Sequence, residues 1–176
     1  MSEHAAGVAS RTSGRALRVL VDGRVLQNRY HGIGRHTYEL VGRLAERGVE
    51  LVVVHDPAAP TRLDVPGLCR RGAVRLVPFT DPVVSPWAQP RWPGLLRAER
   101  PDVVLTPYHL AAPWVHPGVP TVTFVHDCIF ESFPQARPAG RLFGPKYRAV
   151  TRLALNRSTA IATISAVATV KTAAAE

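Results

Sequence analysis

The sequence lacks long hydrophobic runs. Its longest wholly aliphatic runs, such as Leu51–Val54, are far shorter than the roughly 20 apolar residues that a helix needs to cross a bilayer. Residues 1–16 are small and polar, carry Glu3 and have no apolar central region, so they do not resemble a secretory signal. We therefore expect a flexible N-terminal tail over residues 1–16 of a cytoplasmic protein. Residues 17–176 are expected to form one domain, because a hydrophobic content of 46% suffices for one sizeable core.

Cysteine is scarce as well. The two cysteines, Cys69 and Cys128, have no His or Cys partner at metal-ligand spacing. Neither a disulfide framework nor a zinc site is indicated, and a reducing compartment fits this composition. We therefore expect no bound metal.

Acidic residues are few: 13 stand against 22 basic ones, which gives a formal net charge of +9. This excess favours attraction to phosphate in nucleic acid, anionic lipid or a nucleotide-linked substrate. The arginines are scattered, and the sequence has no recognition motif and no basic patch with interleaved aromatic residues. We therefore expect no nucleic-acid partner, and a generally basic surface remains the alternative explanation of the charge.

Short apolar segments alternate with helical patterns along the chain. Each predicted strand is a β-branched, apolar run bounded by Gly, Pro or polar residues. The predicted strands lie at 18–22, 49–55, 73–79, within 101–107 and 120–127, and at 159–165. Helices are predicted from Gly34 to about Gly48, at 94–100, at 141–156 and after 165, whereas the proline-rich residues 81–93 predict irregular structure. This alternation predicts an α/β fold, a Rossmann-like doubly wound parallel sheet covered on both faces.

Ligands of such folds bind at the carboxyl ends of the strands, so the residues that follow each strand are the candidates. These residues are Asp22–Gly34, His55 and Asp56, Thr106–His109, His126 and Asp127, and Ser165.

Two glycines, Gly32 and Gly34 in the stretch "YHGIGRHTYEL", separate the first predicted strand from the first predicted helix. Glycine lets a ligand approach the backbone, and free N–H groups at a helix start favour an anion, so a phosphate or diphosphate fits here. The dinucleotide fingerprint has a third glycine where this chain has Thr37, which disfavours NAD, and no Walker phosphate loop is present. The alternative is that both glycines only form a tight strand-to-helix turn.

Histidines near the strand ends are the candidates for proton transfer. His126 can accept a proton or bond a sugar hydroxyl, and the adjacent carboxylate of Asp127 can orient it or instead cap a turn. His109 is a similar but weaker candidate, and a purely structural role is the alternative for both histidines. We expect His31 and His36 to face solvent, with His31 close to the proposed anion.

Three segments together resemble one enzyme family. The segment "DGRVLQNRYHGIGRHTYELVGRL" resembles the first strand, glycine loop and helix of family-4 glycosyltransferases, which have the glycosyltransferase-B fold. The segment "VTFVHDCIFESFPQ" resembles their His-Asp segment, and "RLALNRSTAIATISAVA" resembles the helix and strand that close their N-terminal domain. The likeness runs from about Arg18 to the C-terminus. It implies the acceptor-side half of a two-domain enzyme, with the C-terminal donor-binding domain missing from this chain.

The resemblance implies transfer of a sugar from a nucleotide-diphosphate donor to an acceptor, with retention and without an essential metal. It places Gly32, Ile33 and Gly34 beside the donor diphosphate, with Arg35 to counter the phosphate charge. It places His126 at the reacting sugar and Asp127 in a supporting role. No cofactor is implied beyond the nucleotide sugar, which is a co-substrate. Ala168 stands where the family often has a second serine after the position of Ser165, which weakens any role for Ser165.

A carbohydrate or lipid-linked acceptor is the expected second substrate. His109 and Trp87 are the acceptor-side candidates, and Trp87 and Trp92 either stack on a sugar or lipid or close the edge of the core. The basic helix at 141–156 offers peripheral contact with a membrane surface, and packing of its apolar face on the sheet is the alternative.

Two other functions remain open. One is a non-catalytic binding module for a phosphorylated ligand or partner protein. The other is a dehydrogenase or epimerase, for which Asp56 would be the ribose-binding residue and against which Thr37 counts.

Overall fold

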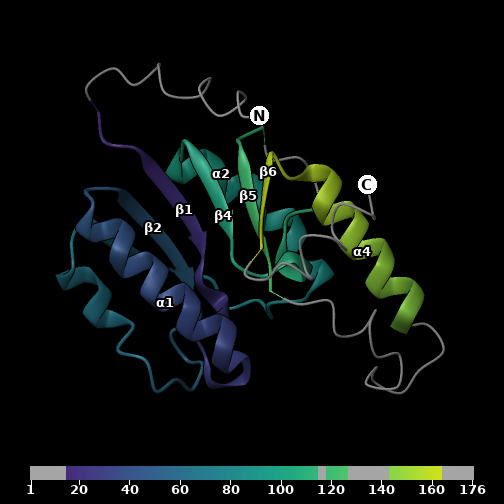
Figure 1. The fold of residues 1–176 in the computed structure, drawn as a ribbon, viewed down its shortest axis with the longest axis horizontal. Helices are drawn as coiled ribbons and strands as arrows, with labels where there is room; N and C mark the ends of the chain where they lie inside the picture. The colour runs from purple at the N-terminus through teal and green to yellow at the C-terminus, as the bar shows by residue number, and fades with distance from the viewer. Residues whose placement is uncertain (1–14, 115–117, 127–142, 164–176) are drawn as a thin grey trace, which may run out of the picture.

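A computed structural model describes residues 15–114, 118–126 and 143–163 (Figure 1). Six parallel strands form one sheet in the order β3-β2-β1-β4-β5-β6. The strands are β1 (Arg18–Asp22), β2 (Glu50–His55), β3 (Val74–Pro78), β4 (Val103–Thr106), β5 (Thr121–Val125) and β6 (Ala160–Thr163). The predicted α/β, Rossmann-like sheet is confirmed. Its strand order reverses between β1 and β4, which is where such folds bind ligands.

Helices cover both faces of the sheet. The α-helices are α1 (His31–Glu46), α2 (Trp92–Glu99) and α4 (Phe143–Arg157), and the short 3₁₀ helices are η1 (Gly23–Val25), η2 (Asn28–Tyr30), η3 (Pro66–Arg70), η4 (Pro86–Arg91) and η5 (His109–Ala111). Val21 packs with Val41 of α1 on one face, and Leu20 packs with Trp92 of α2 on the other. Successive strand residues point to opposite faces, so the uninterrupted apolar runs are the signature of strands buried on both sides.

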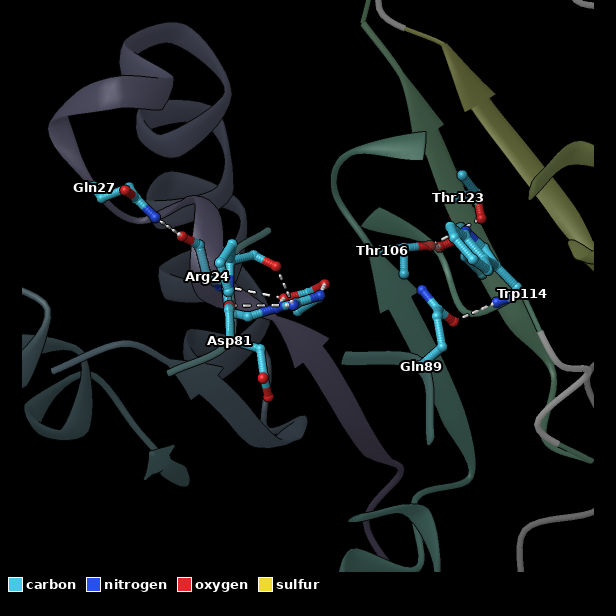
Figure 2. Close-up of polar contacts among 10 residues, drawn as sticks. Arg24, Gln27, Asp81, Gln89, Thr106, Trp114 and Thr123 are labelled. Atoms are coloured by element: carbon cyan, nitrogen blue, oxygen red, sulfur yellow. Dashed lines mark hydrogen bonds and ion pairs between the residues drawn. The ribbon is translucent and has the colours of Figure 1, made fainter. Parts of the chain in front are cut away.

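The C-terminal part of the sheet is joined by buried hydroxyl groups. The hydroxyls of Thr106 on β4 and Thr123 on β5 lie 2.8 Å apart (Figure 2). The Ser158 hydroxyl, just after α4, also donates to Thr123 at 2.6 Å, so α4 packs against the same face of β5. Within α4, Tyr147 and Ala154 are buried while Lys146 is exposed, as the predicted amphipathic pattern requires. Within the described residues, no helix has the length and apolar character needed to cross a membrane.

The predictions for two helical segments are wrong. Helix α1 begins at His31 rather than at Gly34, because η2 leads directly into it, so both glycines lie in its first turn. Residues 86–91 form η4, although proline-rich residues 81–93 predict irregular structure. Pro86 and Pro93 lie at the starts of η4 and α2. The first N–H groups of a helix have no hydrogen-bond partner within the helix, so a proline there removes no helical hydrogen bond.

Candidate functional site

Two neighbouring pockets open at the carboxyl ends of the strands. The arginine pocket, about 340 Å³, is lined by Gln27, Asn28, His31, Gly32, Arg35 and Thr61–Leu63. The tyrosine pocket, about 540 Å³, is lined by Gln27, Arg29, Tyr30, Asp56, Thr80–Val84, Tyr108 and Leu110. Both volumes fall in the range of roughly 300–1,000 Å³ that is typical of small-molecule sites. Gln27 belongs to both pockets, so ligands bound in the two would be neighbours.

The arginine pocket carries positive charge and no carboxylate among its lining residues. Arg35 comes from the first turns of α1, and Arg62 comes from the loop after β2. That loop is held against η2, because the Arg62 backbone N–H donates to Asn28 Oδ1 at 3.0 Å and the Asn28 N–H donates to Pro60 O at 2.9 Å. The arrangement suits an anion.

The N-terminus of α1 adds to this preference. Tyr30 occupies the N-cap position but makes no side-chain capping bond, and the first turn contains no acidic residue. The first N–H groups of a helix have no partner within the helix and form its positive end. A phosphate against this turn would therefore meet backbone donors as well as Arg35.

The two glycines of α1 have different surroundings. A Cβ atom added at Gly32 would meet nothing within 4 Å, whereas one added at Gly34 would lie 2.6 Å from the backbone oxygen of Val25. Gly34 is thus required for close packing of α1 on the segment after β1. Ile33 packs its side chain into an apolar cluster with Val25 and does not line the arginine pocket. Of the four residues predicted beside a diphosphate, Gly32 and Arg35 line the pocket.

His126, directly after β5, is buried at 9% exposure. Its Nε2 lies 2.7 Å from Pro107 O, and because a carbonyl oxygen only accepts, Nε2 carries a proton. In the neutral ring the lone pair that accepts a proton is therefore on Nδ1. His126 stacks on Phe124 with ring centroids 6.2 Å apart.

His36 of α1 completes this aromatic cluster. Its ring meets the edge of His126 at 5.0 Å between centroids and lies 5.3 Å from Phe124. Its Nδ1 is buried without a hydrogen-bond partner in the described part of the chain. The predicted solvent-facing position of His36 is wrong, because α1 crosses the sheet with this side of the helix toward β5. The exposed position of His31 is confirmed.

The tyrosine pocket was not predicted as a unit. The rings of Tyr30, after β1, and Tyr108, after β4, face each other across the switch point at 5.8 Å between centroids. Burial raises the pKa of the Tyr30 phenol, although the cations Arg29 and Arg24 lower it, so the hydroxyl stays protonated at neutral pH. The sequence offered one signal for this pocket, which is position after a strand. Three of its lining residues, Tyr30, Asp56 and Tyr108, lie in such segments.

A comparison with protein families assigns the chain. A model of Glycosyltransferase Family 4 matches residues 30–169 of the 176. The chain belongs to Glycosyltransferase Family 4. The comparison with curated proteins found no match. The matched range of this family-4 domain begins at Tyr30, at the wall between the two pockets, and includes both α1 and His126.

Neither His109 nor Trp87, the predicted acceptor-side residues of the family-4 domain, lines either pocket. His109 is buried between Tyr108 and Tyr147, at centroid distances of 5.3 and 5.9 Å. Trp87 is 80% exposed on η4, whereas Trp92 is 1% exposed and belongs to the core. Asp127 and Ser165 lie outside the described residues. In the described part of the family-4 domain, no three His, Cys, Asp or Glu side chains gather as a metal site would require.

Beneath the tyrosine pocket the family-4 domain contains a fully buried ion pair that the sequence reasoning missed. Asp22 and Arg24 are each 1% exposed and make two side-chain bonds, Nη2 to Oδ2 at 2.7 Å and Nε to Oδ1 at 2.9 Å. Arg24 also donates to Pro82 O at 3.0 Å, and its backbone oxygen accepts from Gln27 Nε2 at 2.6 Å (Figure 2). Burial works against the charge, but Asp22 raises the pKa of Arg24 above its ordinary value. The pair ties the end of β1 to the loop that carries Asp81.

Proposed function

We propose that this family-4 domain contributes to transfer of a sugar from a nucleotide-diphosphate donor to an acceptor, with retention at the anomeric carbon. The arginine pocket is the observation that carries the proposal. It combines the uncapped N-terminus of α1, the open face of Gly32 and the cations Arg35 and Arg62. In the proposal the donor diphosphate lies against this pocket, in a cytoplasmic enzyme of carbohydrate biosynthesis.

The chemistry required of the pocket is stabilisation of a leaving group. As the bond between the sugar and the diphosphate breaks, negative charge grows on the phosphate oxygens. Fixed N–H groups and guanidinium groups stabilise that charge without having to reorganise at the moment of reaction. The nucleotide sugar is a co-substrate, and the proposal includes no resident cofactor.

His126 is the proposed contact of the reacting sugar. Its bond to Pro107 fixes the orientation of the ring at the end of β5. An imidazole ring held in one orientation can position a sugar hydroxyl by hydrogen bonding. Asp127 is proposed to support it. Catalysis further needs donor and acceptor held together, so we propose that a second domain of the glycosyltransferase-B fold completes the cleft.

The donor half of the proposal is tested by Arg35→Gln. We expect the unmodified chain to bind inorganic diphosphate, UDP or GDP in calorimetry, and Arg35→Gln to weaken that binding at least about tenfold, because a charge-assisted hydrogen bond is worth about 1.5–3 kcal/mol. Arg43→Gln is the matched control, since Arg43 is an exposed arginine in the last turns of the same helix and lies outside the pocket. Absence of diphosphate binding in the unmodified chain, or an equal loss in both variants, would overturn the donor assignment.

The acceptor-side role is tested by His126→Gln in an enzyme that contains both domains. Glutamine keeps an N–H donor for Pro107 O but lacks the ring nitrogen that accepts. We expect kcat for sugar transfer to fall about tenfold, since a net hydrogen bond of about 1.4 kcal/mol in the transition state is lost. Diphosphate binding, measured in parallel at a temperature where the variant is folded, should change little. An unchanged kcat would remove His126 from the reaction.

A further inference from the structure

Helix α1 carries two consecutive side chains that face different parts of the molecule. Arg35 lines the arginine pocket, whereas the ring of His36, the next residue, contacts the ring of His126 at 5.0 Å between centroids. The proposed diphosphate site and the proposed contact of the reacting sugar therefore flank the same turn of one helix.

The position of α1 on the sheet is fixed by close packing. A Cβ atom added at Gly34 would lie 2.6 Å from the Val25 backbone oxygen, and Val41, two turns further along, is fully buried in the core. His36 lies four residues before Leu40, which packs against the same core, so both belong to one side of the helix. Because α1 can rotate only by breaking these contacts, the place of the His36 ring above β5 is fixed.

The rings of Phe124 and His126 lie on one face of the sheet, since residues two apart in a strand point to the same side. The His36 ring contacts both of them. It meets the His126 ring with an interplanar angle of 84° and lies 5.3 Å from the Phe124 ring between centroids. Edge-to-face contact is a preferred arrangement of aromatic rings, so the His36 ring favours one orientation of the His126 ring.

The His126 ring is held by contacts from two other segments of the chain. Its Nε2 lies 2.7 Å from the backbone oxygen of Pro107, directly after β4. One hydrogen bond fixes one point of a ring, so a second contact is needed to fix its plane. The edge-to-face contact with His36 supplies such a contact from α1.

The surroundings of His36 indicate that its ring acts by shape. Its Nδ1 is buried and has no hydrogen-bond partner among the residues that the structure describes. The neighbouring Phe124 ring is apolar. A buried polar atom without a partner lowers stability, so a phenylalanine ring, which has no such atom, fits the contact at least as well.

We propose that His36 is a positioning residue, whose ring holds the His126 imidazole in the plane in which it meets the reacting sugar. Through α1 it also sets the distance between that imidazole and the donor diphosphate. The inference rests on the proposed function, since it takes His126 as the contact of the sugar and Arg35 as part of the donor site. His36 itself touches neither substrate.

Imidazole NMR of the 176-residue chain tests the contact without any assay of activity. The His126 ring signals are assigned by their loss in His126→Gln. We expect nuclear Overhauser contacts from the His126 ring to Pro107 in the unmodified chain and in His36→Phe, and their loss in His36→Leu. Tyr38→Leu is the matched control and should keep them, because Tyr38 is a half-buried aromatic residue of the same helix whose ring faces Arg71.

Kinetics of an enzyme that contains both domains test the role in the reaction. We expect His36→Leu to lower kcat about fivefold, which corresponds to about 1 kcal/mol of lost orientation. The KM for the nucleotide sugar should not change, because Gly32 and Arg35 are intact. His36→Phe should restore most of the lost kcat, and Tyr38→Leu should have no effect on it at a temperature where every variant is folded.

The outcomes separate this inference from the proposed function. If the His126 ring kept its contacts in His36→Leu, or if kcat fell equally in His36→Leu and Tyr38→Leu, the positioning role would be overturned and the proposed function would stand. A loss in His36→Phe as large as that in His36→Leu would assign the effect to the nitrogen atoms of His36 and overturn positioning by ring shape. An unchanged kcat in His126→Gln would instead overturn the acceptor-side part of the proposed function, and the role of His36 in the reaction with it.

Discussion

Replacing Arg24 with Gln is expected to lower the free energy of unfolding by about 3–5 kcal/mol, the cost of leaving one charge of a buried pair without its partner. Asp22 would keep its carboxylate at 1% exposure while losing two guanidinium hydrogen bonds. Pro82 O would lose its donor as well. Urea unfolding of the purified chain, followed by circular dichroism, measures the change.

An exposed ion pair supplies the matched control. Arg70 and Asp64 lie 2.6 Å apart with side chains 74% and 58% exposed, so Arg70→Gln should cost at most about 1 kcal/mol. The double variant Asp22→Asn with Arg24→Gln should cost less than the sum of the two single changes, because no uncompensated charge stays buried. If Arg24→Gln and Arg70→Gln lowered the free energy of unfolding equally, the buried pair would contribute no more to stability than an exposed one, which would contradict this prediction.

The buried pair also connects stability to the tyrosine pocket. Arg24 reaches from the end of β1 to the carbonyl groups of Asp81 and Pro82, residues that line the tyrosine pocket. Its guanidinium lies over Phe79 at 5.0 Å from the ring centre. Loss of Arg24 should therefore loosen the loop after β3, and with it the position of Asp81.

The sheet was predictable because its signals are local. Each strand is a short β-branched run, and burial on both faces of a parallel sheet removes any need for alternating polar residues. The first strand, Arg18–Asp22, has the predicted bounds, and the others differ by a few residues at their ends. Residues at the predicted positions after the strands line both pockets.

The contacts that define the pockets were not predictable because they join distant parts of the chain. Arg24 bonds to carbonyl groups 57 and 58 residues away, and nothing near Arg24 in the sequence indicates them. His36 lies three residues after Ile33 and four before Leu40, on the apolar side of α1, and the solvent-facing prediction rested on its polar side chain. Only the position of α1 against β5 shows that its partner there is His126. Tyr30 and Tyr108 meet only because β1 and β4 are neighbours in the sheet.

The different surroundings of the two glycines of α1 could not be predicted from the sequence either. They lead to the second of the two largest expected effects on stability. Gly34→Ala is expected to lower the free energy of unfolding by about 2–3 kcal/mol, the upper range for overpacking, because the new methyl group would lie 2.6 Å from the Val25 backbone oxygen. A backbone atom cannot turn away as a flexible side chain can, so α1 or the segment after β1 must shift. Thermal or urea unfolding of the variant measures the loss.

Gly32→Ala is the matched control for Gly34→Ala, in the same helix turn and with the same chemical change. Its methyl group would meet nothing within 4 Å, and alanine is favoured over glycine in helices by up to about 1 kcal/mol, so stability should be unchanged or slightly higher. The same methyl group would stand in the arginine pocket, so diphosphate binding should weaken in a protein that is no less stable. Equal stabilities for the two variants would contradict the distinct roles of the glycines, because only close backbone packing separates Gly34 from Gly32.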